Sequence, residues 1–305
     1  MTTPRARGRR RGFTLLELIL ALTIGLVVLT TATAVAASTW QSIRGVGIRD
    51  NVTRNSRYIA ATLQRDVQET GVDLASSVDF GSLAVWNDTI AILRVPYEPT
   101  PPGDYPLSPV NFPTGVCGTT CVDIETGGAA PQLAVGDVAR IQVNTVRRLV
   151  YVTAVNQVNG VYRIEFANTP TLLNHAAGIG GLAITTPAST LIQRLGVVVY
   201  WRANGQLFRA TRLNPDLTLR GETLATGVQA LTGRLVFTDG SEAAQADNGS
   251  DGNANNDYDD IAGLRVRATL RGERTDPRVN GGQPVRRDLQ WWFAPRNLVY
   301  ERNRT

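Results

Sequence analysis

The side chains best suited to hold a metal ion lie in one acidic stretch of the sequence, residues 239–260. Carboxylates crowded with Gly and Asn are the composition of a Ca²⁺-binding loop. The candidate ligands are Asp247, Asp251, Asp257, Asp259 and Asp260. The EF-hand register is not followed, because a loop starting at Asp247 would place Gly249 third and Tyr258 twelfth. A solvated loop between two strands is the alternative, and calorimetric titration with Ca²⁺ separates the two hypotheses.

The sequence has two cysteines, Cys117 and Cys121, in a loop that reads CGTTC. In an oxidising compartment such a pair can form a structural disulfide that closes the short loop. A thiol redox motif would have two intervening residues, and a zinc site would need more ligands than the single histidine, His175, supplies. We therefore predict a Cys117–Cys121 disulfide, which mass measurement with and without reductant tests.

Signals of catalysis are sparse. The sequence has one histidine, no nucleophile elbow, no cluster of metal-ligating His and Cys, and no Gly-rich phosphate loop. Carboxylates that pair only in space escape a reading of the sequence, so a membrane-anchored hydrolase is the least favoured alternative. We expect a non-enzymatic protein with no cofactor other than the candidate Ca²⁺.

The basic charge is concentrated at the N-terminus. The first twelve residues contain five arginines and no acid, which equals the formal net charge of +5 of the whole sequence. The chain after Gly12 is therefore formally neutral. Proteins that bind nucleic acid normally carry their basic excess in the folded part, so the charge argues against a nucleic-acid partner and leaves it a minor alternative.

The segment after Gly12 can cross a membrane. It contains no charged residue between Leu18 and Trp40, and about 20 such residues span a hydrocarbon core of about 30 Å as a helix. The arginine cluster before it should stay in the cytoplasm, which places the bulk of the chain on the other side. One carboxylate, Glu17, lies inside the apolar run, where an acid normally needs a partner.

The order basic leader, then Gly-Phe-Thr-Leu-Leu-Glu, resembles the class III signal of type IV pilins and type II secretion pseudopilins. The resemblance implies that prepilin peptidase cuts between Gly12 and Phe13 and that Phe13 becomes N-methylated. It implies that Glu17 pairs with the N-terminal amine of a neighbouring pilin subunit. It further implies an inner-membrane protein that meets an assembly platform and then enters a filament in the periplasm or at the cell surface.

The helix should continue beyond the membrane to about Thr70. An apolar stripe at helical spacing, with polar neighbours, predicts one face packed on a sheet. The stripe consists of Ile48, Val52, Ile59, Leu63 and Val67. Gly71 is a candidate C-terminal stop, and Gly45 and Gly47 predict a bend or local melting in the middle of the helix.

The remaining sequence has the pattern of an antiparallel sheet, with strand-like runs separated by turn residues. Two hairpins are predicted at Asn159-Gly160 and Asn204-Gly205, because Asn-Gly supplies the positive φ angles of a tight turn. Further strands are expected at residues 89–95, 136–143, 230–238, 262–271 and 285–293. One tryptophan of Trp291-Trp292 should join the core, and the tail or a neighbouring subunit could cover the other.

We predict an α+β fold in which the long helix packs on an antiparallel sheet. The expected parts are a leader at 1–12, a transmembrane assembly helix at 13–40, its amphipathic half at 41–71, a pilin-like β domain at 72–95 and 191–305, and a β-rich inserted lobe at 96–190.

Segments such as VVVYWRANGQLFRATR and RRDLQWWFAPRN resemble PilW-type minor pilins, with J-type secretion pseudopilins as relatives. This resemblance implies a minor subunit that primes, caps or joins a type IV pilus. The alternatives are a pseudopilin of a type II secretion system, and a tip adhesin or DNA-uptake receptor whose natural binding site would be the 96–190 lobe.

Overall fold

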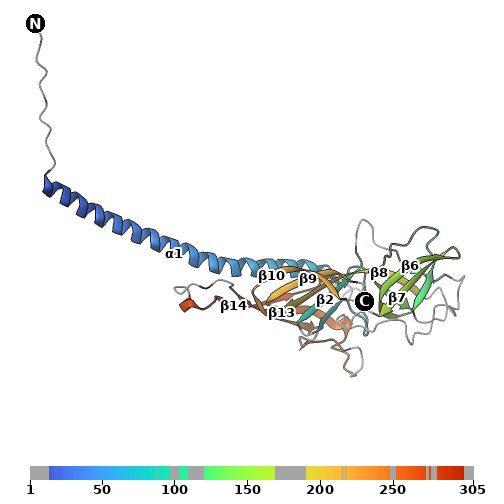
Figure 1. Ribbon diagram of the computed structural model, residues 1–305. Coiled ribbons are helices and arrows are strands. Elements are labelled where there is room, and N and C mark those ends of the chain that lie inside the picture. The colour runs from blue at the N-terminus through green and yellow to red at the C-terminus, as the bar shows by residue number, and fades with distance from the viewer. Residues whose placement is uncertain are drawn as a thin grey trace, which may run out of the picture.

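The computed structural model describes residues 14–86, 88–96, 103–108, 120–168, 190–214, 216, 218–247, 252–272, 275 and 280–298. In these residues one long helix precedes two antiparallel sheets, which confirms the predicted α+β class (Figure 1). The helix projects from the β domain as a single arm, with most of its N-terminal half free of contact.

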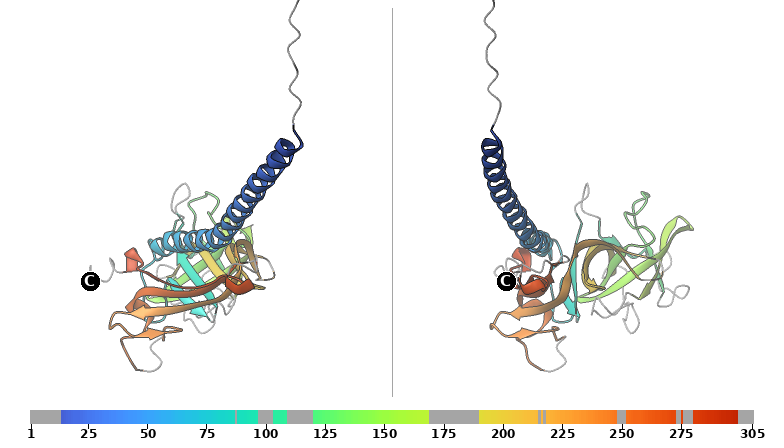
Figure 2. Two further views of the ribbon diagram at one scale, coloured as in Figure 1. Left: turned by 90° about the vertical axis from the view of Figure 1, so that its left-hand side faces the viewer. Right: turned by 60° about the vertical axis from the view of Figure 1, so that its left-hand side comes forward.

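The helix α1 runs from Leu15 to Gln68 as one element of 54 residues. It stays helical through Gly45 and Gly47, and Figure 2 shows that it bends between the projecting half and the half on the sheet. The predicted apolar stripe is buried at Val52, Ile59 and the positions after it, whereas the Ile48 side chain lies outside the described residues. Gly71 follows with a φ of +72°, which confirms the predicted stop.

The larger sheet has ten strands, with the main order β1-β2-β8-β5-β6-β7-β4. Its strands are β1 (Leu83–Trp86), β2 (Thr89–Arg94), β3 (Tyr105–Pro106), β4 (Cys121–Ile124), β5 (Val138–Val143), β6 (Val146–Val158), β7 (Val161–Asn168), β8 (Thr190–Ala203), β9 (Gln206–Leu213) and β10 (Leu219–Thr226). In the described residues these strands pair with one another in antiparallel fashion.

Both predicted Asn-Gly hairpins are present. Asn159 and Gly160 connect β6 to β7, with φ angles of 50° and 83°, and Asn204 and Gly205 connect β8 to β9, with φ angles of 49° and 72°. Two consecutive positive φ angles are the requirement of the tight turn whose twist matches that of the flanking strands. The local sequence therefore sets the register of four strands.

The 14-residue strand β8 joins the two regions of the large sheet. Its second half pairs with β2 and β9, and its first half pairs with β5 and β3. Strands β4 to β7 extend the sheet beyond the C-terminal end of α1, away from the projecting arm (Figure 1). The proposed division at residues 96–190 stays a prediction, because β8 carries one hydrogen-bonded sheet across that border.

The smaller sheet has the order β12-β11-β13-β14, with β11 (Val228–Phe237), β12 (Glu242–Ala243), β13 (Ile261–Arg271) and β14 (Arg286–Phe293). Its inner face shares one apolar core with α1 and with β1, β2 and β8. Gly233 of β11 allows the close contact, because a Cβ there would lie 3.0 Å from the Val85 side chain. The second half of α1 packs against this core, in contact with β10 of the larger sheet and with β13 and β14 of the smaller one.

Candidate functional site: the N-terminal helix

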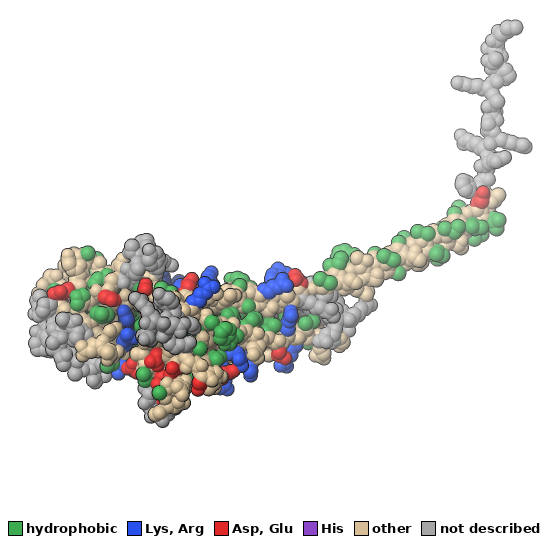
Figure 3. Space-filling view, turned by 180° about the vertical axis from the view of Figure 1, so that it is seen from behind, with side chains coloured by type: hydrophobic (Ala, Val, Ile, Leu, Met, Phe, Trp, Pro, Cys, Tyr) green, Lys and Arg blue, Asp and Glu red, His purple; other side chains and the backbone are tan. Residues whose placement is uncertain are grey.

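The first half of α1 is an uncovered apolar rod. Its segment Leu15–Ile43 has 29 residues, and none of the side chains in its most apolar window is buried by the rest of the chain. At 1.5 Å per residue this segment is about 43 Å long, which is enough to cross a membrane. Figure 3 shows apolar side chains along the whole projecting arm. Such a surface requires lipid, or neighbouring helices, as its surroundings.

The hydroxyl groups of the same rod are satisfied within the helix. Thr23 donates to the Leu20 carbonyl at 2.9 Å, Thr30 to Val27 at 2.9 Å, and Thr33 to Leu29 at 2.9 Å. A hydroxyl that bonds to its own helix does not need water as a partner. The threonines are therefore compatible with a membrane. Because their side chains are small, they also allow a second helix to approach α1 closely.

Glu17 caps the helix on which it lies. Its backbone N–H donates to the Thr14 hydroxyl oxygen at 3.3 Å, and its carboxylate accepts from the Thr14 N–H and hydroxyl at 3.2 Å each. This reciprocal pair is a capping box, with Thr14 as the N-cap. The carboxylate is thereby held beside the helix N-terminus, whose partial positive charge stabilises an anion.

Thr14 is a residue that the interpretation of the sequence missed, although its signal is present. The pattern Thr14-x-x-Glu17 ahead of an apolar run is the signature of a capping box. Gly12 and Phe13, the residues that flank the predicted cleavage, lie outside the described residues, so the position of the cut stays a prediction.

A buried ionic cluster anchors the other end of α1 to the large sheet. Asp66 is 1% exposed. Arg209 of β9 donates two hydrogen bonds to its carboxylate, from Nε to Oδ2 at 2.7 Å and from Nη2 to Oδ1 at 3.1 Å. The Tyr200 hydroxyl of β8 donates to the same carboxylate. Asp66 directly precedes Val67 of the apolar stripe, and as a polar neighbour of that stripe it would be expected to face solvent. It faces the interior because Arg209 and Tyr200 bind and neutralise it.

Proton affinities in this cluster follow from its contacts. Burial raises the pKa of Asp66, but the hydrogen bonds from Arg209 and Tyr200 and the charge of Arg209 outweigh it and hold this pKa below its ordinary value. Burial and the neighbouring carboxylate raise the pKa of Tyr200. The cluster is consequently one anion and one cation with a neutral phenol at ordinary pH, and it fixes α1 against β8 and β9.

The structure brings together three of the five candidate Ca²⁺ ligands. One carboxylate oxygen from each of Asp257, Asp259 and Asp260 lies within 4.8 Å of the others. The backbone of Asp247 forms an isolated β-bridge with that of Asp257, so Asp247 is adjacent to the group. Asp251 lies outside the described residues. Asp257 is buried, Asp260 is half-buried and Asp259 is exposed, and acidic groups also gather without a metal, so Ca²⁺ binding stays a prediction.

Of the two cysteines, Cys121 lies buried in β4, and Cys117 lies outside the described residues, as does His175. The Cys117–Cys121 disulfide therefore stays a prediction.

Comparison with known proteins adds one finding to this geometry. Residues 7–33 match the family model described as the prokaryotic N-terminal methylation motif. No curated protein matches the chain. The matched residues include the predicted cleavage site, the capping box and the first half of the membrane span, so the motif and the exposed apolar helix coincide. The chain carries a type IV pilin-like prepilin signal, which continues into the helix that the structure leaves uncovered.

Proposed function

We propose that this protein is a minor pilin-like subunit, cut by prepilin peptidase between Gly12 and Phe13 and assembled through α1 into a type IV pilus. One observation carries the proposal: the methylation motif at residues 7–33 leads directly into an apolar helix that nothing in the described chain covers. Proteins with this motif are structural subunits, and the helix supplies both a membrane anchor and, after extraction, a surface for other helices.

Glu17 would then specify how helices pair. An unpaired carboxylate is costly in an apolar bundle and tolerable beside an ammonium group. The capping box holds this carboxylate at the start of the helix, close in sequence to the amine that cleavage would create on Phe13. Pairing of Glu17 with the amine of a neighbouring subunit would fix the axial register of otherwise uniform apolar helices.

The position of the lobe favours the tip of the filament. Strands β4 to β7 lie beyond the C-terminal end of α1, on the side away from the membrane-spanning arm (Figure 1). In a filament built of parallel helices, the subunit above, farther from the membrane, would sit on this side. A subunit that blocks this side while offering its helix to the subunits below would prime or cap the filament.

The change Glu17→Ala tests the proposal. We expect the leader to be cleaved normally, since Gly12 and Phe13 are unchanged, and the amount of the protein in purified filaments to fall at least tenfold. Intact mass would report cleavage, and immunoblots of sheared filaments and membranes would report incorporation. Glu222→Ala removes an exposed carboxylate from β10 and serves as the matched control. Equal incorporation of the two variants would refute the role of Glu17.

A further inference from the structure

The outer face of the smaller sheet is lined with arginines. On β13 the residues that alternate with the buried ones point outwards, and the neighbouring strands continue each row. The arginines of this arginine face are Arg234 on β11, Arg265, Arg267 and Arg271 on β13, and Arg286 on β14. Among the described residues of these strands and of β12, two acids accompany them, Glu242 and Asp288.

Two pairs of these arginines lie directly opposite each other. Arg234 of β11 is the cross-strand partner of Arg265, and Arg271 of β13 is the partner of Arg286. Like charges at directly opposite positions destabilise a sheet. Glu242 pairs with Arg265, and Asp288 lies 3.3 Å from Arg286, so each pair is only half neutralised by the described residues. An external anion would remove the remaining repulsion.

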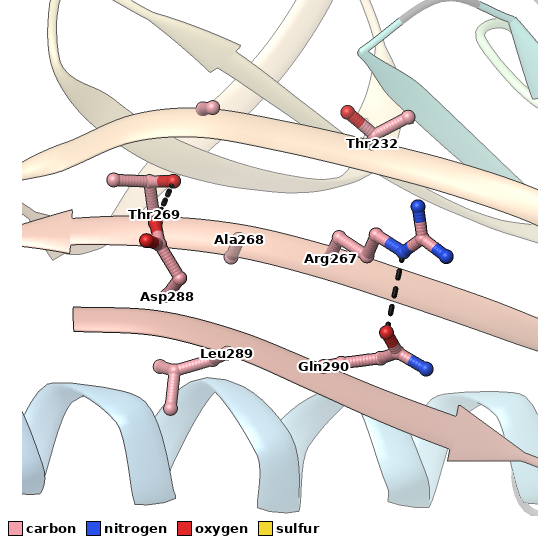
Figure 4. A pocket seen from close by; sticks show the side chains of 8 residues that line it. Thr232, Arg267, Ala268, Thr269, Asp288, Leu289 and Gln290 are labelled. Carbon is pink, nitrogen blue, oxygen red and sulfur yellow. Dashed lines mark hydrogen bonds between the residues drawn. The ribbon is translucent and has the colours of Figure 1, made fainter.

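Two hollows lie in the part of this face between Arg267 and Arg286. A hollow of about 420 Å³ is lined by Thr232, Arg267 and Gln290, and it adjoins one of about 530 Å³ that contains Arg271 and Arg286. Figure 4 shows the floor of the first hollow, where Arg267 is hydrogen-bonded to Gln290 and Thr269 to Asp288. Arg271 lies six positions after Arg265 on β13, so positive charge extends over about 20 Å.

An exposed tryptophan ends the same face. Trp292 of β14 is the cross-strand partner of Arg265, and its side chain is 55% exposed. The indole lies against Gly263, where a Cβ would be only 3.0 Å from the ring nitrogen. The glycine therefore lets the ring lie close to the strand, with much of its surface open to solvent.

We propose that the arginine face binds single-stranded nucleic acid, with phosphates along the arginine rows and a base stacked on Trp292. A basic groove with an exposed aromatic ring is the common design of such sites. The neutral charge of the chain after the leader had argued against nucleic acid. The structure distributes this charge unevenly, because five arginines and two acids lie on this face, whereas Asp257, Asp259 and Asp260 gather just before β13.

The composition of the face favours nucleic acid over an acidic protein. Protein interfaces have an apolar, aromatic-rich centre, whereas nucleic-acid interfaces are polar and rich in positive charge. The hollows are lined by arginines and one acid, Asp288, together with Thr232, Thr269 and Gln290, whose neutral groups hydrogen-bond phosphates. Trp292 lies at one end of the face, so the centre of the face is polar and charged.

Fluorescence anisotropy of a labelled 20-mer oligothymidylate with full-length protein in detergent tests the proposal. We expect Trp292→Ala to weaken binding roughly five- to 150-fold, the measured effect of losing one stacked base. Arg271→Gln and Arg286→Gln should each weaken binding and lower the salt slope, log K against log salt concentration, by about 0.7 per lost phosphate. Unfolding midpoints of all variants would confirm that they fold.

Arg287→Gln is the matched control. Arg287 is adjacent to Arg286 and carries the same charge, but it donates to the Thr53 hydroxyl of α1 at 3.2 Å, away from the arginine face. The proposal predicts that Arg287→Gln binds like the unmodified protein. Equal losses for the Arg286 and Arg287 variants would overturn it, as would absence of binding in 50 mM salt. Equally tight binding of polyglutamate would also overturn it and assign the face to an acidic protein.

Discussion

At the scale of single residues, Asp66 is the side chain whose removal should cost the most stability. Asp66→Ala leaves the Arg209 guanidinium, 14% exposed, without its bidentate partner and the Tyr200 hydroxyl without its acceptor. Breaking a buried ion pair in this way costs about 3–5 kcal/mol. We expect a loss of this size in urea unfolding of the full-length protein in detergent, followed by tryptophan fluorescence.

Asp50→Ala is the control for this prediction. Asp50 also pairs with an arginine, Arg54 at 3.3 Å, but both side chains are mostly exposed. An exposed pair of this kind contributes about 0.5 kcal/mol or less. Similar losses for the Asp50 and Asp66 variants would contradict the anchoring role of the buried cluster.

The same cluster sets a pH dependence. The pKa of Asp66 is lower in the folded protein than its ordinary value, so the folded state binds the proton less readily than the unfolded state. The stabilisation is complete above the unfolded pKa of about 3.9 and is lost as the pH falls through the folded pKa. The stability difference between the protein and Asp66→Asn should be constant from pH 8 to 5 and shrink below about pH 4.

Sequence distance explains which functional residues could be predicted. Glu17 and its N-cap Thr14 are three residues apart, so a local pattern identifies both. Asp66 meets Tyr200 and Arg209 across 134 and 143 residues, and no local pattern joins them. A carboxylate beside a helical stripe is ordinarily solvated, and only the folded sheet reveals the partners that make burial favourable.

At the scale of elements, strands with a strong local sequence signal were predicted correctly, and strands with a weak signal were missed. The hairpins at Asn159 and Asn204 were predictable from their turns alone. Strand β4 was missed because it has four residues and contains Asp123, which is buried in a bidentate pair with Arg163 at 2.7 and 2.9 Å. Strand β10 was missed because, among the described strands, β9 is its one partner and most of its side chains are exposed, which removes the alternation.

The turn between β10 and β11 provides a prediction for an element. Gly227 has a φ of +74°, and a Cβ there would lie 2.2 Å from the Arg271 carbonyl oxygen. Gly227→Ala should therefore strain the backbone and push β13 away, with a loss of about 3 kcal/mol in urea unfolding. Gly128 also has a positive φ, of +89°, but open space around it, so Gly128→Ala should cost about 1–2 kcal/mol. Equal losses would show that the contact with β13 is not tight.

At the scale of the whole molecule, overall composition concealed two separations. The formal charge after the leader is zero, yet arginines line the outer face of the smaller sheet and acids gather at Asp257 and its neighbours. Hydrophobic residues are likewise divided between a buried core and an exposed arm. Counts of residue types cannot show such separations, because they depend on which strands become neighbours and which face each strand turns outwards.

The position in the filament is a property of the whole molecule and can be tested with a tag. Gly127 and Gly128 lie in an exposed turn between β4 and β5, with open space around both, so a short epitope inserted between them should not disturb the sheet. A subunit with its lobe beyond the end of α1 should accept antibody-gold label only at filament ends. The same tag on Glu17→Ala should leave the ends unlabelled, and label spread along the shafts would exclude the tip position.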